Sequence, residues 1–528
     1  MWMGDNLFNQ NGVTRVVQSS KSISHVMDTL RVFTTRKKNC YSIKADKGEK
    51  VLVRASFFYG NYDNKASPPS FDLQLDGNDW ATVQTSSDEL VYYEVIYVVK
   101  GETTSVCVAQ TKPNQFPFMS ALEIHSLDSL MYSHVDSNFA LYLSTRVAYG
   151  TNETIRNPDD IYDRIWVPGV VGNGLTKVTS DALFISNNVA DNPPQAVLQN
   201  AITTSTNSGY IILSPGVSSG VVPIYVNMYF SEVTELDSTQ KRSFKVYKDN
   251  QSFSEPIIPP YGNVSEMYVS NITVSSNTTF SLVATSDSTL PPLINAMEIF
   301  YISDALTDGT NSNDVEGLSS LQTQFGVLQE WGSDPCLPAS FTWEWVNCST
   351  DATPRVTALD LSSFGLLGLL PDFSSMDAIE TIDLHNNSLV GAIPDFLGAF
   401  PNLKELVTGN PDLCASGKSC PSTSYSGSKK KKNKLPVILG TTIPSFLVVW
   451  AIAGVLAILR QKRKKASVAA VGAGQTGGAN GPNGMAGKIG EAVMDEFKVY
   501  VEEQVNVEMA DQVNQQVQQG QYDGRNTS

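Results

Sequence analysis

The segment Pro117–Ile124 reads PFMSALEI, and the later segment Pro292–Ile299 reads PLINAMEI. Two other pairs of segments repeat in the same order and at nearly the same offset along the chain. They are VRASFF (Val53–Phe58) with YVNMYF (Tyr225–Phe230), and FDLQLDGN (Phe71–Asn78) with FKVYKDNQ (Phe244–Gln251). A single match can arise by chance, but three matches in order predict two similar domains in tandem.

Both copies alternate apolar and polar residues over short runs rich in Val, Ile, Tyr, Phe and Thr, with Asn, Asp, Gly and Pro between the runs. This pattern is typical of strands joined by tight turns, so we expect a mainly β protein with two β-sandwiches, at residues 1–140 and 141–305. Fewer residues precede the matched strands in the first copy than in the second. We therefore expect the first sandwich to be truncated at its N-terminus and to lack opening strands, which would expose unpaired backbone groups.

A second kind of repeat follows a linker and cysteine-containing cap at residues 306–354. The run VTALDLSSFGLLGLLPDF, which starts at Val356, is followed 23 residues later by a similar run, IETIDLHNNSLVGAIPDF, which starts at Ile379. This spacing predicts a short leucine-rich repeat solenoid over residues 355–420, in which Leu and Ile side chains stack inward and Asn387 bonds the backbone of the turn. Two or three repeats are too few for a long curved binding surface, so we interpret the segment as a spacer or docking element.

One segment is long and apolar enough to be a single transmembrane helix. Residues 435–459 contain no charged side chain, and about 20 apolar residues suffice to cross the hydrocarbon core. Ten basic and no acidic residues lie between Lys429 and Lys465, so basic segments flank the predicted helix on both sides. We expect a juxtamembrane segment at 421–434 and a short cytoplasmic tail at 460–528.

Cysteines and glycosylation sequons predict the orientation, because the basic flanks are balanced. All six cysteines precede the span, as expected for an oxidising compartment, and their placement predicts three disulfides. The pairs are Cys40–Cys107, Cys336–Cys348 and Cys414–Cys420. Seven N-x-S/T sequons also precede the span, at Asn152, Asn250, Asn263, Asn271, Asn277, Asn347 and Asn386, against one beyond it at Asn526. We expect a single-pass plasma-membrane glycoprotein with its N-terminal region outside the cell.

Composition and motifs argue against several functional classes. Residues 1–428 hold 24 Lys and Arg against 45 Asp and Glu, a net charge of −21, which disfavours nucleic acid as a partner. The four histidines are scattered without metal-ligand spacing, and no GxSxG or CxxC motif occurs. Gly472, Gly474 and Gly477 spell GxGxxG, but in a low-complexity linker with no strand before it. We therefore expect no enzymatic activity, no catalytic residue, no metal and no cofactor.

Four strings resemble the plant malectin-like leucine-rich repeat receptor kinases, and especially their symbiosis-receptor relatives. They are TLRVFTTRKKNCYSI (Thr29–Ile43), VRASFFYGNYDN (Val53–Asn64), YDRIWVP (Tyr162–Pro168) and WGSDPCLP (Trp331–Pro338). The resemblance implies two malectin-like sandwiches joined to the repeats by a WxGDPC segment, in which Ser333 replaces the usual glycine. Most members continue into a kinase domain, for which the segment after Leu459 is too short.

The resemblance also implies binding of an extracellular ligand. Animal malectin holds a diglucoside between aromatic rings and acidic or amide side chains, and this chain offers similar side chains at equivalent positions of both copies. The candidate ligand-binding residues are Phe58, Tyr59, Asn61, Tyr62, Asp63, Tyr229, Phe230 and Glu232. Alternate aromatics in a strand are usually core residues, which argues against a sugar site at these positions. Plant members of the family are also known for peptide and protein partners, so the ligand class stays open between carbohydrate and peptide or protein. The acidic charge favours a basic peptide.

Two classes of function fit these expectations. The first is a cell-surface receptor-like protein that binds its ligand and acts with a kinase-bearing co-receptor. The second is a non-signalling decoy or a structural membrane protein. The first residues, MWMGDNLFNQNGV, contain no apolar run as long as a signal peptide needs, which agrees with the expected truncation.

Overall fold

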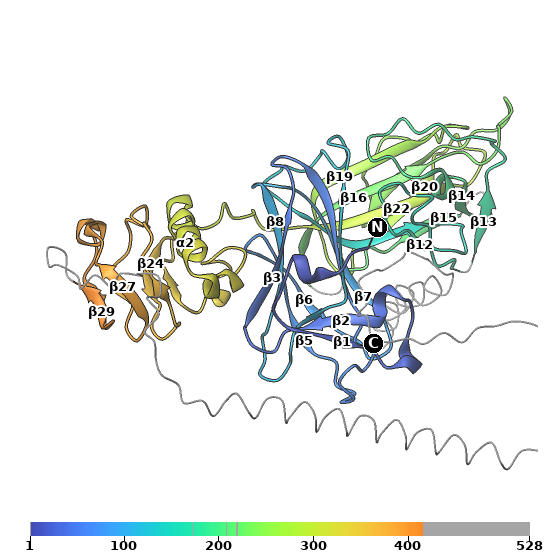
Figure 1. The fold of residues 1–528 in the computed structure, drawn as a ribbon. Helices are drawn as coiled ribbons and strands as arrows, with labels where there is room; N and C mark the ends of the chain where they lie inside the picture. The colour runs from blue at the N-terminus through green and yellow to red at the C-terminus, as the bar shows by residue number, and fades with distance from the viewer. Residues whose placement is uncertain (1, 173, 207–208, 218–219, 415–528) are drawn as a thin grey trace, which may run out of the picture. The chain divides into compact units, whose positions relative to one another are not determined.

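The computed structural model describes residues 2–414, except 173, 207–208 and 218–219, and these residues form mainly strands (Figure 1). The predicted transmembrane helix at 435–459 and the tail beyond it lie outside the described residues. Within the part that is described, none of the helices is both long and apolar enough to cross a bilayer. The helices are α1 Gln195–Leu198 and α2 Ser312–Gln324, with 3-10 helices η1 Asp5–Leu7, η2 Ser19–Lys21, η3 Val26–Asp28, η4 Gly326–Glu330, η5 Ala339–Phe341 and η6 Asp395–Ala399.

The first sequence repeat contributes ten strands. They are β1 Val13–Val16, β2 Thr29–Val32, β3 Lys38–Lys44, β4 Lys50–Phe57, β5 Ser70–Leu75, β6 Asn78–Gln84, β7 Val91–Val98, β8 Thr103–Ala109, β9 Phe118–Met119 and β10 Ala121–Ser126. One sheet has the order β1-β2-β9 and another the order β3-β8-β5-β6, while β10, β4 and β7 lie together in a larger sheet.

The second repeat contributes ten strands in the same arrangement. They are β13 Leu175–Thr179, β14 Asn200–Thr204, β15 Tyr210–Leu213, β16 Val222–Phe230, β17 Phe244–Lys248, β18 Gln251–Ser252, β19 Ser265–Val274, β20 Phe280–Ala284, β21 Leu293–Ile294 and β22 Ala296–Ile302. The orders β13-β14-β21, β15-β20-β17-β18 and β22-β16-β19 match those of the first copy. The expectation that the first copy lacks opening strands therefore needs correction, because β1 and β2 stand where β13 and β14 do.

Strand β11 (Leu141–Ala148) joins the two copies into one sheet. It pairs antiparallel with β7 on one side and with β22 on the other, and β12 (Val167–Pro168) pairs parallel with its end. The result is an eight-stranded sheet in the order β10-β4-β7-β11-β22-β16-β19, with β12 beside β11. One face packs on the sandwich cores, and apolar side chains from the loops that follow β10 and β11 cover the other. Strands β4, β16 and β22 of the shared sheet are thus buried on both faces over most of their length.

Equivalent aromatic pairs fix how the two copies correspond. The ring centroids of Phe57 and Phe71 lie 5.4 Å apart, and those of Phe230 and Phe244 lie 5.3 Å apart. Phe230 is therefore the counterpart of Phe57, whereas the sequence comparison paired it with Phe58. Because side chains alternate between the two faces of a strand, this error of one residue assigned the neighbouring positions to the wrong faces.

After the second copy, α2 precedes two small sheets. The strands are β23 Val346–Cys348, β24 Val356–Asp360, β25 Leu367–Gly368, β26 Thr381–Asp383, β27 Ser388–Ala392, β28 Glu405–Val407 and β29 Asp412–Cys414. Strands β24, β26 and β28 pair in parallel, as do β25, β27 and β29. As expected, the Asn387 side chain bonds the backbone: its Nδ2 donates to the carbonyls of Leu361 and Leu384, and its Oδ1 accepts from Leu366 N at 3.0 Å. Asn410 makes equivalent contacts one repeat further along the chain.

Two predicted disulfides are confirmed. Cys40 and Cys107 join the directly opposed strands β3 and β8, and Cys336 and Cys348 close a short loop before β24. The third predicted pair, Cys414 and Cys420, lies partly outside the described residues.

Candidate functional site

Five of the eight predicted ligand-binding residues are buried. The side chains of Phe58, Tyr59, Tyr229, Phe230 and Glu232 are at most 1% exposed. An aromatic ring without an exposed face cannot stack on a sugar in this conformation, so these five residues support the loops after β4 and β16 rather than contact a ligand directly. A ligand-binding role for this region therefore depends on the loop residues.

The loop after β4 carries the other three predicted residues, Asn61, Tyr62 and Asp63, which are half-buried. Asn61 has a positive φ of 50°, and its Oδ1 accepts from Ala66 N at 2.8 Å, which closes the loop. Asp63 accepts a hydrogen bond from the Tyr59 hydroxyl. Burial and this bond raise the pKa of Tyr59 to about 12, so its hydroxyl stays neutral and holds the loop at physiological pH. Only the partly exposed edges of these side chains face solvent.

In the second copy, Glu232 is engaged in a buried ion pair. Arg242 Nε lies 2.7 Å from Glu232 Oε2, and the two side chains are 8% and 1% exposed. The backbone N of Glu232 also donates to the carbonyl of Pro260, which brings the loop before β19 against the end of β16. Glu232 thus positions a neighbouring loop and is not free to bind a ligand.

That neighbouring loop forms an exposed apolar surface, which was not among the predicted sites. Ser186 N donates to the Gly262 carbonyl at 2.9 Å, so the segments around residues 183 and 261 lie side by side. We call the exposed apolar residues of these segments the second-copy patch: Leu183 (99% exposed), Phe184 (67%), Ile258 (58%) and Tyr261 (38%). The signal in the sequence was two apolar runs, ALFI and PIIPPY, at positions between strands where turns are ordinarily polar.

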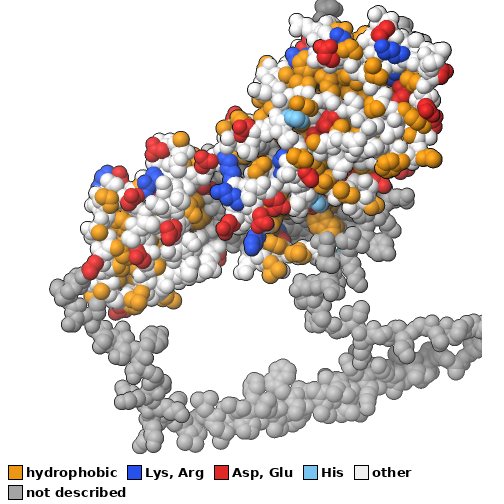
Figure 2. Space-filling model, turned by 90° about the horizontal axis from the view of Figure 1, so that it is seen from above, with side chains coloured by type: hydrophobic (Ala, Val, Ile, Leu, Met, Phe, Trp, Pro, Cys, Tyr) orange, Lys and Arg blue, Asp and Glu red, His pale blue; other side chains and the backbone are white. Residues whose placement is uncertain are grey.

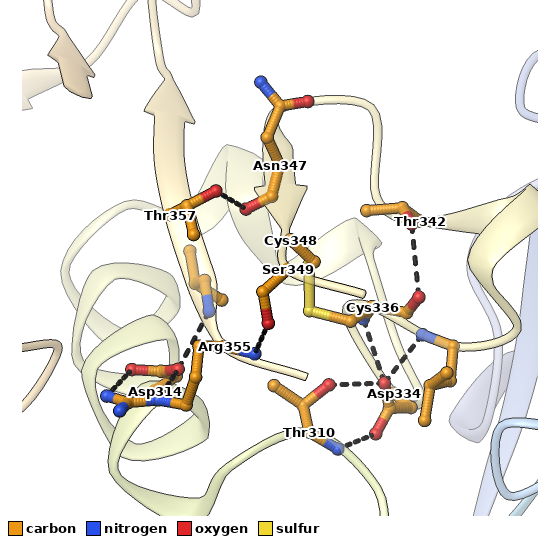
Figure 3. Close-up of a disulfide and its surroundings, with 12 residues drawn as sticks. Thr310, Asp314, Asp334, Cys336, Thr342, Asn347, Cys348, Ser349, Arg355 and Thr357 are labelled. Atoms are coloured by element: carbon orange, nitrogen blue, oxygen red, sulfur yellow. Dashed lines mark hydrogen bonds and ion pairs between the residues drawn. A yellow bond between two sulfur atoms is a disulfide. The ribbon is translucent and has the colours of Figure 1, made fainter. Parts of the chain in front are cut away.

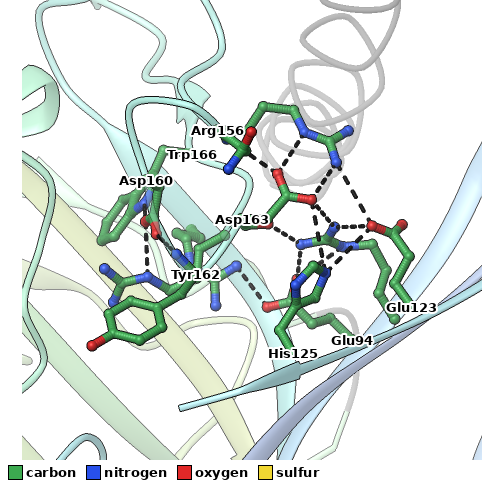
Figure 4. A network of polar contacts seen from close by, with 12 residues as sticks. Glu94, Glu123, His125, Arg156, Asp160, Tyr162, Asp163 and Trp166 are labelled. Carbon is green, nitrogen blue, oxygen red and sulfur yellow. Dashed lines mark hydrogen bonds and ion pairs between the residues drawn. The ribbon is translucent and has the colours of Figure 1, made fainter. Parts of the chain in front are cut away.

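A row of alternating charges crosses the eight-stranded sheet. Figure 4 labels one of its members, Glu94, beside the polar contacts of Glu123 and Asp163. Arg54 Nη2 lies 2.9 Å from Glu94 Oε2, and Arg146 lies 2.6 Å from both Glu94 Oε1 and Glu298 Oε1. All four side chains are at most 1% exposed. Arg54 and Glu94 come from β4 and β7, whereas Arg146 and Glu298 come from β11 and β22, so the row links the two copies. Its charges are compensated internally, which makes it a structural feature rather than a reactive site.

Glu123, His125 and Asp163 lie close enough together to be considered as a metal site, with ligand atoms within 4.8 Å of one another. However, Arg156 Nη2 lies 2.6 Å from Asp163 Oδ2, and Arg54 Nη1 lies 3.1 Å from Glu123 Oε2. Burial alone would raise the pKa of Asp163, but the bonds and charges of Arg156 and Arg54 lower it to about 2. Two guanidinium groups occupy the carboxylates and repel a cation, so this cluster is an ion-pair network and not a metal centre.

The charged and aromatic side chains of the string YDRIWVP make buried contacts next to the eight-stranded sheet. Asp160 accepts from Arg164 Nε at 2.8 Å and from Trp166 Nε1 at 2.7 Å. Arg164 also donates to the Asp191 carbonyl, and Trp166 is fully buried. These residues hold the loop that covers the shared sheet, so the acidic residue here has a structural role.

The string WGSDPCLP forms a junction after the second copy (Figure 3). Asp334 Oδ1 accepts from Cys336 N, Leu337 N and Thr310 Oγ1, at 2.6 to 2.9 Å, and Oδ2 accepts from Thr310 N. Lys38 of the first copy donates to the carbonyls of Asp334 and Leu337. Burial lowers the pKa of Lys38 to about 8. The junction is therefore held by one carboxylate and one ammonium group.

Comparison with known proteins gives relatives for most of the described residues. A family model for the malectin-like domain matches residues 1–302. A probable LRR receptor-like serine/threonine-protein kinase of Arabidopsis thaliana is 33% identical over 389 residues, which cover 72% of this chain and 45% of that protein. The LRR receptor-like serine/threonine-protein kinase IOS1 of the same plant is 32% identical, over 66% of this chain and 39% of that protein. The chain thus spans less than half the length of these kinases.

Two solved structures match part of the chain. The ANX2 ectodomain from Arabidopsis thaliana is 15% identical, with a TM-score of 0.49, over 57% of this chain and 92% of that one. A crystal structure of the plant peptide RALF23 in complex with FER and LLG2 contains a chain that is 19% identical, with a TM-score of 0.47, over 56% of this chain and 90% of that one.

Proposed function

The chain belongs to the malectin-like domain family, and on this premise we propose that it is a receptor-like protein of the plasma membrane that binds an extracellular ligand. The two curated relatives described above are named as receptor-like kinases, which supports a receptor role for the matched region. The single observation that carries the proposal is the match of the malectin-like family over both sandwich copies.

The second-copy patch is the surface that we assign to the ligand. Four apolar side chains exposed by 38% to 99% on adjoining loops resemble the central part of a protein interface. Acidic side chains are spread over the face seen in Figure 2 rather than gathered at one point, so their attraction is long-ranged. A peptide or protein with apolar anchors and basic flanks matches both features better than a neutral carbohydrate. In the first copy, the loop at Asn61–Asp63 corresponds to the loop after β16, which adjoins the patch through the bond from Glu232 N to the Pro260 carbonyl.

We also propose how the chain is divided into domains and how it is oriented in the membrane. Residues 1–140 and 141–305 form the two sandwiches, the parallel strands between 355 and 414 belong to a short leucine-rich repeat segment, and 435–459 crosses the membrane. The tail at 460–528 lies in the cytosol, and signalling passes through a kinase-bearing co-receptor. Cys414 pairs with Cys420, and the seven sequons before residue 435 are glycosylated.

Calorimetry on the full chain, produced behind a cleavable signal sequence and purified in detergent, tests the ligand assignment. We titrate basic peptides with apolar anchors, and separately glucan oligomers, at two salt concentrations. Peptide binding that weakens with salt and is lost in Phe184→Ser with Leu183→Ser supports the proposal, whereas Leu130→Ser, at another exposed apolar residue, should leave it unchanged. Glucan binding that is insensitive to salt and is lost in Tyr62→Ala would move the site to the first copy.

The alternative function is a decoy or structural protein. A full chain that binds ligand but whose cellular effect survives deletion of residues 466–528 and does not require a kinase partner would favour the decoy. A chain that binds neither ligand class would remove the receptor assignment and leave the structural role.

A further inference from the structure

Strand β19 is the free edge of the eight-stranded sheet, whereas its counterpart in the first copy is covered. Strand β7 pairs with β4 and with β11, but β19 pairs only with β16 among the described strands. The ten residues of β19, SEMYVSNITV, include one charged side chain and neither Lys nor Pro. Such a long, weakly charged edge can pair with a strand of another molecule, and proteins ordinarily protect edges of this kind.

A bulge interrupts this edge at Asn271. Ile224 faces Ile272 and Val226 faces Val269, so two residues of β19 oppose the single residue Tyr225. Asn271 has a positive φ of 57°, and a bulge of this kind redirects a side chain away from the regular face of the strand. Asn271 and Thr273 are both exposed, and they are the first and third residues of an N-x-T sequon.

Asn271 opens into a groove of about 600 Å³ between β19 and the β17–β18 hairpin. The lining includes the polar side chains of Lys248, Asp249 and Gln251 together with one aromatic ring, Phe253. Sites of this volume hold small ligands, and hydroxyl-bearing sugars need polar partners beside an apolar face. The groove is therefore suited to one or two sugar units attached at its own wall.

We propose that Asn271 carries an N-linked glycan whose first sugars lie in this groove against Phe253, and that this glycan covers the free edge of β19. The inference rests on the proposed extracellular orientation. In the modification, the Asn271 amide nitrogen forms a bond to the anomeric carbon of an oligosaccharide linked to a lipid pyrophosphate. The bond from that carbon to the pyrophosphate oxygen breaks, the lipid pyrophosphate leaves, and the amide proton passes to a base of the transferase.

The first test uses the full chain from a eukaryotic secretory host. Glycopeptide mapping reports occupancy at Asn271, and light scattering in detergent reports the association state of the wild type and of Thr273→Ala. We expect Thr273→Ala to self-associate at concentrations at which the wild type does not. The matched control Ser388→Ala removes the exposed sequon at Asn386, away from β19, and should behave as the wild type.

The outcomes are distinguishable. If Asn271 is unmodified while other sequons carry glycans, the inference is overturned and the proposed orientation stands. If none of the sequons before residue 435 is modified, the orientation fails together with the inference. If Asn271 is glycosylated but Thr273→Ala stays in the wild-type association state, the edge is not what the glycan protects.

The second test addresses the groove itself. A glycan that lies against Phe253 should be released by an endoglycosidase at least about threefold more slowly than the glycan at Asn386, because part of its surface is covered. Phe253→Leu keeps the apolar volume but removes the flat ring, and it should abolish most of this difference while leaving occupancy unchanged. Equal release rates at Asn271 and Asn386 in the wild type would contradict the proposed position of the glycan in the groove.

Discussion

Replacement of Arg146 by methionine is the sharpest test of the link between the two sandwich copies. The Arg146 guanidinium lies 2.6 Å from carboxylates of both Glu94 and Glu298, and the three side chains are at most 1% exposed. The Arg146 guanidinium lies over the Trp166 ring, 5.7 Å from its centroid. Methionine replaces it by a flexible apolar side chain, so the substitution removes the charge with only a small change in packing. In this variant the buried carboxylates of Glu94 and Glu298 both lose the guanidinium group that lies beside them.

The expected cost is about 4 kcal/mol of the free energy of unfolding, since removal of one partner from a buried ion pair typically costs about 3 to 5 kcal/mol. Chemical denaturation followed by tryptophan fluorescence measures it, and the midpoint should fall without a large change in slope. The control is Lys241→Met, because the Lys241–Asp287 pair is exposed on both sides and contributes little. A second variant, Arg146→Met with Glu298→Gln, should recover part of the loss.

The pH dependence gives an independent check. Burial would raise the pKa of Glu94, but Arg146 and Arg54 lower it below its ordinary 4.5, so its stabilising contribution is present above that pH and lost as pH falls through the folded value. In Arg146→Met the pKa of Glu94 rises, and the penalty should be largest at neutral pH and shrink as the solution is acidified. A variant that loses no more stability than Lys241→Met, or whose penalty does not depend on pH, would refute the assignment of the charge row as the link.

Three further predictions concern the disulfides, the junction and the parallel strands. Replacing the Cys40–Cys107 pair by serines should cost about 4 kcal/mol and the Cys336–Cys348 pair about 3 kcal/mol, because the first closes the longer loop; equal losses in denaturation experiments would contradict this order. Lys38, with a folded pKa of about 8 against 10.5 ordinarily, binds fewer protons when folded, so stability should rise with pH between these values, and a pH titration of Lys38→Met should lack this rise. Asn387→Ala removes the side-chain partner of Leu366 N and of the Leu361 carbonyl, while the Leu384 carbonyl keeps its bond from Asn410, and it should cost about 2 to 4 kcal/mol; Asn402→Ala, on the exposed side, should cost less, and similar thermal shifts in both would argue against a stabilising role of the Asn387 bonds.

The sequence predicted features that depend on spacing along the chain. The duplicated segments correspond to matching sheet orders, two of the three cysteine pairs are bonded, and Asn387 bonds the backbone as the repeat pattern predicts. Each of these follows from local alternation or from a fixed repeat length. Three of the four strings that carry the family resemblance lie within residues 1–302, which the family model matches, whereas WGSDPCLP lies beyond them.

The candidate ligand residues were only partly predictable. Aromatic residues at the ends of β4 and β16 suggested a binding site, but Phe58, Tyr59, Tyr229 and Phe230 are fully buried. The second-copy patch escaped notice because its residues come from two loops that are far apart in the sequence. Whether an apolar loop residue is exposed depends on where the neighbouring loop packs, and the local sequence pattern does not determine this.

The sequence by itself determined that the protein contains two similar β-rich copies, because the alternation of apolar residues and the repeat offset are properties of the chain. Only the tertiary structure decided that β11 joins the copies into one eight-stranded sheet, that Arg54 to Glu298 form a continuous charge row across it, and that β19 is left as an edge. The physical reason is that strand pairing and charge compensation are made between segments distant in sequence. Their partners are chosen by backbone hydrogen bonding and burial in three dimensions, not by local pattern.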